Sequence, residues 1–292
     1  MDAPLLDRAD EFNLPHALKI EAGEGGLPRL VVATENAAAH QYLHGATLTH
    51  WQPAGQAPVL FTSAEAVYDG RKAIRGGVPV CFPWFGPHPS DPDAPAHGLA
   101  RTRPWQLTRT AADARGVETR TVLHVGPLQI EQAVVVGPTL EARYTVTNPS
   151  DTDQRFELAL HTYLALGDIH QASVTGLEHA EYLDQLTGEI HRQPDAPITF
   201  TAETDRVYRG TDATCTLHDP ALGRRVVVEK LGGRSTVVWN PWIDKSARTA
   251  DLGDDEWTRF CCIESACIGD DAVTLAPGQR HTLAVTLRVE AA

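Results

Sequence analysis

The chain of 292 residues has little of what marks a membrane, secreted or nucleic-acid-binding protein. No apolar run approaches the roughly 20 residues that a membrane-spanning helix needs. Met1–Asp10 has no basic stretch followed by an apolar segment, so we expect no secretory signal. Lys and Arg number 25 against 38 Asp and Glu, which gives a net charge of −13. Because an acidic surface repels nucleic acid and anionic membranes, we expect neither as a partner.

Cysteine is also sparse. An odd, small set of cysteines favours reduced thiols in the cytoplasm over a disulfide framework. Three of them lie close together in the sequence, but without the paired Cys-x-x-Cys spacing of a zinc site. We therefore expect no metal site. The cysteines are Cys81, Cys215, Cys261, Cys262 and Cys267.

Several catalytic motifs are missing from the sequence. It has no G-x-S-x-G elbow for a nucleophilic serine, no G-x-G-x-x-G or P-loop for a nucleotide, and no H-E-x-x-H for zinc. Nothing in the motifs points to a covalent serine, a bound nucleotide or a required metal, and we expect no cofactor.

Alternation of apolar and polar residues, typical of half-buried strands, recurs along the chain, whereas sustained helical periodicity is scarce. The clearest case is Leu140–Val146, which the turn residues Asn148–Asp151 follow. Further strands are predicted at Leu283–Val289, Val226–Val228, Thr236–Trp239 and Arg155–Leu164, and short helices at Thr62–Tyr68 and Asp254–Phe260.

This pattern indicates an all-β protein with few short helices. Many strands separated by turns, without a βαβ rhythm, predict a large antiparallel sandwich or barrel. No repeat and no low-complexity linker interrupts the chain, so we expect residues 1–292 to form a single domain.

The segment from Arg75 to Arg101 combines glycines, prolines, aromatics, two arginines and two histidines. Gly76 and Gly77 permit positive φ and a close approach of the backbone to a ligand, and the prolines stiffen the loop. The planar guanidinium of an arginine suits paired oxygens of a carboxylate or phosphate. Two interpretations fit: a small-molecule site, or a structural loop around a small aromatic core.

Four other side chains are candidates for chemistry. Glu264 lies in an otherwise apolar or small run, where a buried carboxylate is a candidate general base, although a solvent-facing edge position also fits. His161 is expected on the polar face of a strand, and His97 precedes a glycine; either is also a common structural histidine. Asp205 fits an Asx turn or an ion pair with Arg206.

Taken together, these segments resemble the aldose 1-epimerase superfamily, and more closely its hexose-6-phosphate branch, the glucose-6-phosphate 1-epimerases. They occur in the family's order over most of the chain. The matching segments are Arg75–His88, His97–Arg101, Leu160–Tyr163, Glu203–Tyr208, Val238–Trp242 with Lys245–Ser246, and Cys262–Glu264.

The resemblance implies a large β-sandwich of the galactose-mutarotase type with the sugar on a broad concave face. It implies that His161 is the general acid and Glu264 the general base. His97 and Asp205 match sugar-contacting positions, and Arg75 and Arg101 match positions that bind the sugar or its phosphate. One position departs from the branch: Ala96 stands where relatives often have Gln, before the His-Gly pair.

The implied reaction interconverts the α and β anomers of a hexose 6-phosphate, with glucose 6-phosphate expected, through acid–base ring opening and reclosure. Three alternatives stay open at this point: a mutarotase of free aldoses, a non-catalytic carbohydrate-binding protein, and an isomerase of another sugar phosphate. A small-molecule sugar phosphate is thus the expected partner. The edge strands of an all-β protein must be protected from pairing with other chains, and a dimer is one way to cover them. We expect a monomer or weak dimer.

Overall fold

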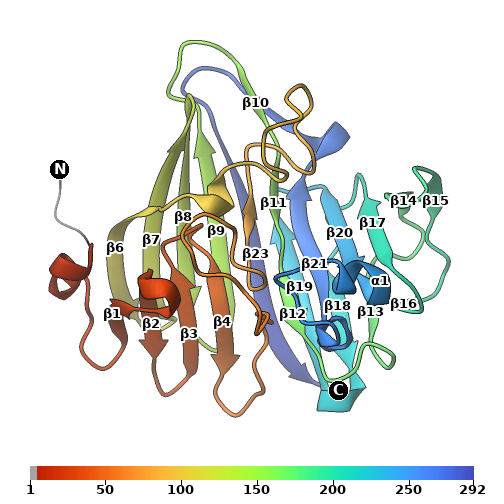
Figure 1. Cartoon of the computed structure of the whole chain (residues 1–292), viewed down its shortest axis with the longest axis horizontal. Helices are drawn as coiled ribbons and strands as arrows, with labels where there is room; N and C mark the ends of the chain where they lie inside the picture. The colour runs from red at the N-terminus through yellow and green to blue at the C-terminus, as the bar shows by residue number, and fades with distance from the viewer. Residues whose placement is uncertain (1–4) are drawn as a thin grey trace.

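The computed structural model describes residues 5–292 and is built almost wholly of strands (Figure 1). The strands are β1 Leu18–Ala22, β2 Pro28–Ala33, β3 Ala37–Tyr42, β4 Leu48–Pro53, β5 Val80–Cys81, β6 Gln106–Asp113, β7 Gly116–Val125, β8 Leu128–Val136, β9 Leu140–Thr147, β10 Gln154–Phe156, β11 Leu158–Leu160, β12 Tyr163–Ala165, β13 Ser173–Thr175, β14 Glu181–Asp184, β15 Ile190–Arg192, β16 Ile198–Thr199, β17 Thr204–Tyr208, β18 Cys215–Asp219, β19 Arg224–Leu231, β20 Ser235–Asn240, β21 Phe260–Cys267, β22 Val273–Leu275 and β23 Arg280–Ala291.

Helices are short, as predicted. The one α-helix is α1, Trp242–Ala247, and the others within residues 5–292 are 3-10 turns. No helix in that range is long and apolar enough to cross a membrane. Residues 1–4, the start of the Met1–Asp10 segment in which we expect no secretory signal, lie outside the residues that the structure describes. The 3-10 helices are η1 Leu5–Glu11, η2 Glu24–Gly26, η3 Ala100–Thr102, η4 Pro220–Leu222, η5 Glu256–Arg259 and η6 Gly269–Asp271.

Two large antiparallel sheets dominate the structure. One has the strand order β16-β13-β18-β19-β23-β9-β8-β7-β6, and the other the order β15-β14-β17-β20-β21-β11-β5 with β12 also paired to β21. A sheet of β1 to β4 and the pair β10–β22 complete the set. Figure 1 shows β1 to β4 lying in front of β6 to β9, with the sheet of β20 and β21 beside them. The predicted antiparallel sandwich is confirmed.

The interior explains why the layers stay together. One apolar cluster runs continuously between the sheets and includes Trp51 of β4, Ile130 of β8, Tyr144 of β9 and Ile263 of β21, each with at most 1% exposure. Along β21 the side chains alternate, because successive residues of a strand point to opposite faces. Cys261 and Ile263 face this core, whereas Phe260 and Cys262 belong to a second, smaller apolar cluster on the other face.

The predicted strands hold at four places: they lie within β9, β19, β20 and β23. The prediction of one continuous strand over Arg155–Leu164 is wrong, since the chain forms β10, β11 and β12 there. It changes partners, with β10 paired to β22 and β11 to β21. A contact from Thr162 N–H to the Leu160 carbonyl, at 2.7 Å, then interrupts the ladder between β11 and β12.

The two helix predictions differ in outcome. Thr62–Tyr68 forms turns and bends instead of a helix. There the Ser63 hydroxyl donates to Glu256 and accepts from the Glu65 N–H, so a local side-chain bond replaces a helical ladder. Asp254–Phe260 contains η5, and its last residue already begins β21.

Candidate active site

The strand register places His161 opposite Glu264. Leu160 of β11 pairs with Ser265 of β21, and Tyr163 of β12 pairs with Cys262 of the same strand. The two pairings keep one register across the interruption, so the residue after Leu160 faces the residue before Ser265. Those two residues are His161 and Glu264. Directly opposed residues of an antiparallel pair have Cβ atoms about 5 Å apart, close enough for their side chains to interact.

Neighbouring strands add further side chains to the same face of the sheet. In β17, β20, β21 and β12 the register aligns Asp205, Trp239, Cys262 and Tyr163 in one row. This row lies next to the row that holds Glu264, and both rows point away from the main core. The sheet face therefore presents aromatic rings, one thiol and two carboxylates around a single imidazole.

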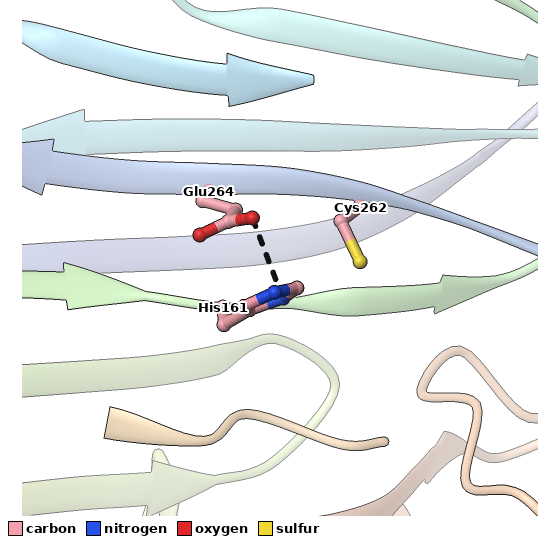
Figure 2. Close-up of side chains that lie close together, drawn as sticks. All are labelled: His161, Cys262 and Glu264. Atoms are coloured by element: carbon pink, nitrogen blue, oxygen red, sulfur yellow. Dashed lines mark ion pairs between the residues drawn. The ribbon is translucent and has the colours of Figure 1, made fainter. Parts of the chain in front are cut away.

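The imidazole and the carboxylate are close and almost fully buried. His161 Nδ1 lies 3.4 Å from Glu264 Oε1, and the residues are 8% and 1% exposed. Figure 2 shows the two side chains pointing toward each other, with Cys262 beside them. Among the described residues, His161 Nδ1 and Glu264 Oε2 have no hydrogen-bond partner. Buried polar atoms without a partner are costly, so this pair is built to meet a ligand.

Burial sets the protonation of the pair. It raises the pKa of Glu264 well above its usual value, and Asp205 adds to the effect, whereas Arg101 opposes it. Burial also lowers the pKa of His161 well below its usual value, helped by His97, Arg101 and Arg75. In the unliganded protein the loss of hydration thus favours the neutral forms of both groups over their mutual attraction as an ion pair. The arrangement that these shifts favour is a protonated Glu264 beside a neutral His161.

His97, in the loop between Arg75 and Arg101, places a second imidazole beside His161. Its Nδ1 accepts a hydrogen bond from the Gly86 N–H at 3.2 Å, which leaves the ring proton on Nε2. Burial, with Arg101 and Arg75, lowers the pKa of His97 to about 3. The ring packs edge-on to Phe85 and to His161, at 4.8 and 5.9 Å between centroids. His97 is thus a neutral hydrogen-bond donor.

Two glycines let the loop approach the sheet. At Gly77, with φ of +67°, a Cβ atom would lie 1.9 Å from the Leu48 carbonyl oxygen, and at Gly98, with φ of +77°, it would lie 2.1 Å from that of Phe82. No side chain fits at either position. These glycines serve the close packing of backbone against backbone, and Gly98 places the histidine before it; the predicted close approach of the loop to a ligand stays a prediction.

The arginines are positioned differently from each other. Arg75 donates to Asp251 and to the Tyr163 hydroxyl, with Nη2 3.0 Å from Asp251 Oδ1, so its charge already has a partner. Arg101 Nη2 donates to the Ala96 carbonyl at 2.8 Å, while its Nε is buried without a hydrogen-bond partner among residues 5–292. Arg101 is the arginine with more bonding capacity left for an anion.

Asp205 contacts a lysine and not the adjacent arginine. Lys245 Nζ of α1 lies 3.6 Å from Asp205 Oδ2 and 2.9 Å from Glu203 Oε1. The same ammonium lies 5.7 Å from the centre of the Trp239 ring. Arg206 instead stacks over Tyr182. The surface ion pair that the sequence allowed between Asp205 and Arg206 is therefore not formed.

All six predicted site residues line one cavity of about 550 Å³. They reach it from the loop, from β17, from β21 and from the segment between β11 and β12. A second hollow of about 300 Å³ shares Arg75 and Arg101 with the first and adds Arg71 and Lys72. The predicted residues in the main cavity are Arg75, His97, Arg101, His161, Asp205 and Glu264.

Sequence reasoning left out several residues of the site. Asp251, which holds Arg75, lies in a loop with no recognisable pattern, and Gln185 lies in the turn after β14. Lys245 lies in a segment that carries the family resemblance, and this resemblance was the sequence signal that could have identified it as a site residue. Cys262 appeared only as a small neighbour of Glu264, yet its sulfur, the imidazole and the carboxylate have ligand atoms within 4.8 Å of one another.

Comparison with known proteins agrees with this geometry. Curated relatives named "Putative glucose-6-phosphate 1-epimerase" include one from Escherichia coli K12, 35% identical over 90% of each chain, and one from Cenchrus ciliaris, 32% identical over 87% of this chain and 82% of the relative. The solved structure of a "putative mutarotase (YeaD)" from Salmonella typhimurium superposes with a TM-score of 0.89 and 28% identity, over 99% of this chain and all of that one.

The fold is shared more widely. Galactose 1-epimerase from Lactobacillus acidophilus superposes with a TM-score of 0.73 at 14% identity, over 96% of this chain and 99% of that one. The sandwich is thus of the galactose-mutarotase type. Residues 29–288 match the family described as aldose 1-epimerase. The chain belongs to the aldose 1-epimerase family of isomerases.

Proposed function

We propose that this enzyme interconverts the α and β anomers of glucose 6-phosphate. The observation that carries the proposal is the facing pair of His161 and Glu264, buried on the floor of a cavity whose wall carries Arg75 and Arg101. The names of the relatives at 32% and 35% identity support the same reaction. A binding protein has no need of an imidazole and a carboxylate held without other partners.

The chemistry uses the single proton of the pair. When the sugar's hydroxyl groups donate to Glu264, they favour its ionised form, and the proton moves to His161. Glu264 then takes the proton of the O1 hydroxyl while His161 gives its proton to the ring oxygen O5, and the C1–O5 bond breaks. The open aldehyde rotates about C1–C2 and closes on its other face, with both proton transfers reversed. In each step one residue gains a proton and the other loses one, so the pair of His161 and Glu264 holds one proton before and after the step.

The surrounding side chains orient the sugar. The Nε2–H of His97 is a fixed donor for a sugar oxygen, and the carboxylate of Asp205, already held by Lys245, accepts from a hydroxyl. Trp239 offers an aromatic face beside the pair, at 5.5 Å from His161 between centroids. Such positioning raises the rate by holding the reacting atoms in a near-attack arrangement.

The phosphate group fits the second hollow. Arg71, Lys72, Arg75 and Arg101 line it, which concentrates positive charge in a protein of net charge −13. Arg101 is the principal contact, because Arg75 is held by Asp251. A charge-assisted arginine–phosphate pair is stronger than a neutral hydrogen bond and often bidentate. The free, buried thiols of all five cysteines favour a cytoplasmic location for this enzyme.

Substitution of the pair tests the reaction. We expect Glu264→Gln and His161→Ala each to lower the rate of catalysed anomer exchange by about 10²–10⁴-fold, the contribution of a positioned acid or base. Exchange spectroscopy by NMR on glucose 6-phosphate measures the rate, with the spontaneous rate subtracted. Circular dichroism checks that each variant is folded. Near-normal exchange in a folded Glu264→Gln enzyme would overturn the assignment of the base.

Substitution of the arginines tests the substrate. Arg101→Ala is expected to raise KM for glucose 6-phosphate by about tenfold or more, since a hydrogen bond to a charged group contributes roughly 1.5–3 kcal/mol. It should change KM for glucose little. Arg75→Ala serves as the comparison, and its effect combines loss of charge with release of Asp251. If Arg101→Ala weakens both sugars equally, the residue contacts the sugar ring and the preference for phosphate is wrong.

A further inference from the structure

We propose that His161, Cys262 and Glu264 form a binding site for one borderline-soft divalent cation, Zn²⁺ being the biological case, and that the cation switches off the acid–base pair. The sequence predicted no metal site, because the spacing of the cysteines among themselves fits none. The structure brings one of those cysteines to a histidine and a carboxylate instead. The binding itself stands apart from the proposed function; only the switching rests on it.

The geometry carries the inference. One ligand atom from each of the three side chains lies within 4.8 Å of the other two. Figure 2 shows Glu264 and Cys262 extending from the same strand toward the His161 ring, so the three atoms surround one point. In a tetrahedral zinc site the metal lies about 2.0–2.3 Å from such ligands, which puts the ligand atoms about 3.5 Å from one another, so atoms as far apart as 4.8 Å must close by about 1 Å when the metal binds.

Two of the three ligands have lone pairs that no other group uses. His161 Nδ1 and Glu264 Oε2 lack hydrogen-bond partners among the described residues, and both residues are more than nine-tenths buried. Cys262 adds a fully buried sulfur. The fourth position of a metal held there faces the cavity that His161 and Glu264 line, open to water or to an oxygen of the sugar.

The ligand set selects the class of cation. Imidazole, thiolate and carboxylate together suit Zn²⁺ and its heavier relative Cd²⁺, whereas Mg²⁺ and Ca²⁺ prefer oxygen ligands alone. The charge also balances. A thiolate at Cys262 and a carboxylate at Glu264 together carry two negative charges, which match the two positive charges of the metal once both groups have lost their protons. The buried site stays neutral overall, as a poorly hydrated region requires.

Occupation of this site excludes the reaction. The metal takes the Nδ1 lone pair of His161 and the carboxylate of Glu264, so neither group can accept or give a proton. Anomer exchange is therefore expected to stop when the metal binds and to return when a chelator removes it. Loss of the Cys262 thiol removes one of the three ligands, so the sensitivity to the metal should be lost with it.

The test uses the purified full chain and Cd²⁺ as the probe. Titration is followed by the ultraviolet charge-transfer absorption between thiolate and cadmium, which surface histidines do not produce. We expect the absorption to saturate at one equivalent in the wild-type protein and to be lost in the nearly isosteric Cys262→Ser. Zn²⁺ should displace Cd²⁺, and removal of the thiol should weaken binding by about 100-fold or more, since even changes outside the direct ligands cost 10–100-fold.

Cys267→Ser is the matched control. Cys267 lies on the same strand, and its sulfur is 3.5 Å from His281 Nε2, the alternative thiol–imidazole pair. The Cys267→Ser variant should keep the charge-transfer absorption of the wild-type protein with Cd²⁺. No absorption in the wild-type protein, equal absorption in Cys262→Ser, or loss only in Cys267→Ser would each overturn the site. If Cd²⁺ binds as expected but anomer exchange continues, the switching is wrong. If the enzyme shows no anomer exchange at all, the proposed function fails while the absorption still decides the metal site.

Discussion

A buried carboxylate and a buried imidazole, each with one atom that has no hydrogen-bond partner among residues 5–292, lie at the centre of the proposed site. In water at neutral pH a carboxylate is ionised, and an imidazole, with a pKa near 6.5, is protonated in part. Here the loss of hydration favours the neutral forms of Glu264 and His161, and the pair keeps one proton. Because the two groups are coupled, the proton belongs to the pair, and its two titration steps are properties of both residues.

The pH dependence of kcat follows from these shifts. A second proton must go to His161, whose pKa lies well below 6.5, and the single proton must leave Glu264, whose pKa lies well above 4.5. Both shifts therefore widen the pH range in which the pair holds one proton, compared with the range that the ordinary pKa values would give. We expect kcat at saturating glucose 6-phosphate to stay level through pH 6.5 and to fall only at lower pH. NMR exchange rates between roughly pH 4.5 and 9, corrected for spontaneous exchange, measure it.

Saturating substrate is needed, because the phosphate group itself titrates near pH 6 and would change KM. An acid limb of kcat centred at or above pH 6.5 would show a normal imidazole and contradict the burial argument.

At the scale of elements, one side chain joins the loop to the sheet. Glu157 lies between β10 and β11 and accepts from the Phe85 N–H at 2.9 Å and from the Gly269 N–H at 2.8 Å. The next residue of the loop, Gly86, donates to His97 Nδ1. Glu157 thus fixes the backbone that fixes the tautomer of His97, and it acts as a positioning residue.

We expect Glu157→Ala to lower kcat/KM by roughly 10- to 100-fold, since small displacements of positioning groups have effects of that size. The ¹⁵N NMR signals of His97 should show loss of the single Nε2–H tautomer. Glu178→Ala is the control, because Glu178 also accepts from a backbone N–H, that of Gly176, away from the cavity. Unchanged His97 signals in Glu157→Ala would refute this role.

At the scale of the whole molecule, a buried ion pair ties the layers together. Arg224 of β19 and Asp219 of β18 are 2% and 0% exposed, with Arg224 Nε 3.3 Å from Asp219 Oδ2. The guanidinium also donates to the carbonyls of Ala57, Pro58 and Ala165, which come from the loop after β4 and from β12. The Arg224 side chain of the nine-stranded sheet therefore contacts both the loop that follows β4 and strand β12 of the sheet that carries the site.

Asp219→Ala should lower the free energy of unfolding by about 3–5 kcal/mol, because it leaves the arginine charge buried without its partner. Asp113→Ala breaks the exposed ion pair with Arg115 and should change the free energy of unfolding by about 1 kcal/mol or less. Urea unfolding followed by tryptophan fluorescence measures both. Similar values for the two variants would mean that Asp219 does not compensate Arg224. For a single domain over residues 1–292, as we propose, circular dichroism should give the same transition.

The sequence was sufficient for several features of the site. Gly98 follows His97 because no side chain fits there, and Glu264 sits in a run too apolar for a solvent-facing strand. Such local signals, with the family resemblance carried by the order of the motifs, led to six of the residues that line the cavity. The helix at Thr62–Tyr68 was wrong because its local pattern gave no sign of the bond between Ser63 and the distant Glu256.

By itself, the sequence determined the all-β class, the alternating faces of the four strands that it predicted correctly, and the family. Alternation has a period of two, so it assigns faces from neighbouring residues alone. Only the tertiary structure decided which strands are neighbours and in what register. That register put His161 opposite Glu264 and close to Cys262, while the packing of two loops set Asp251 against Arg75. These contacts join segments far apart in the chain, and the packing of the layers, not any local preference, selects them.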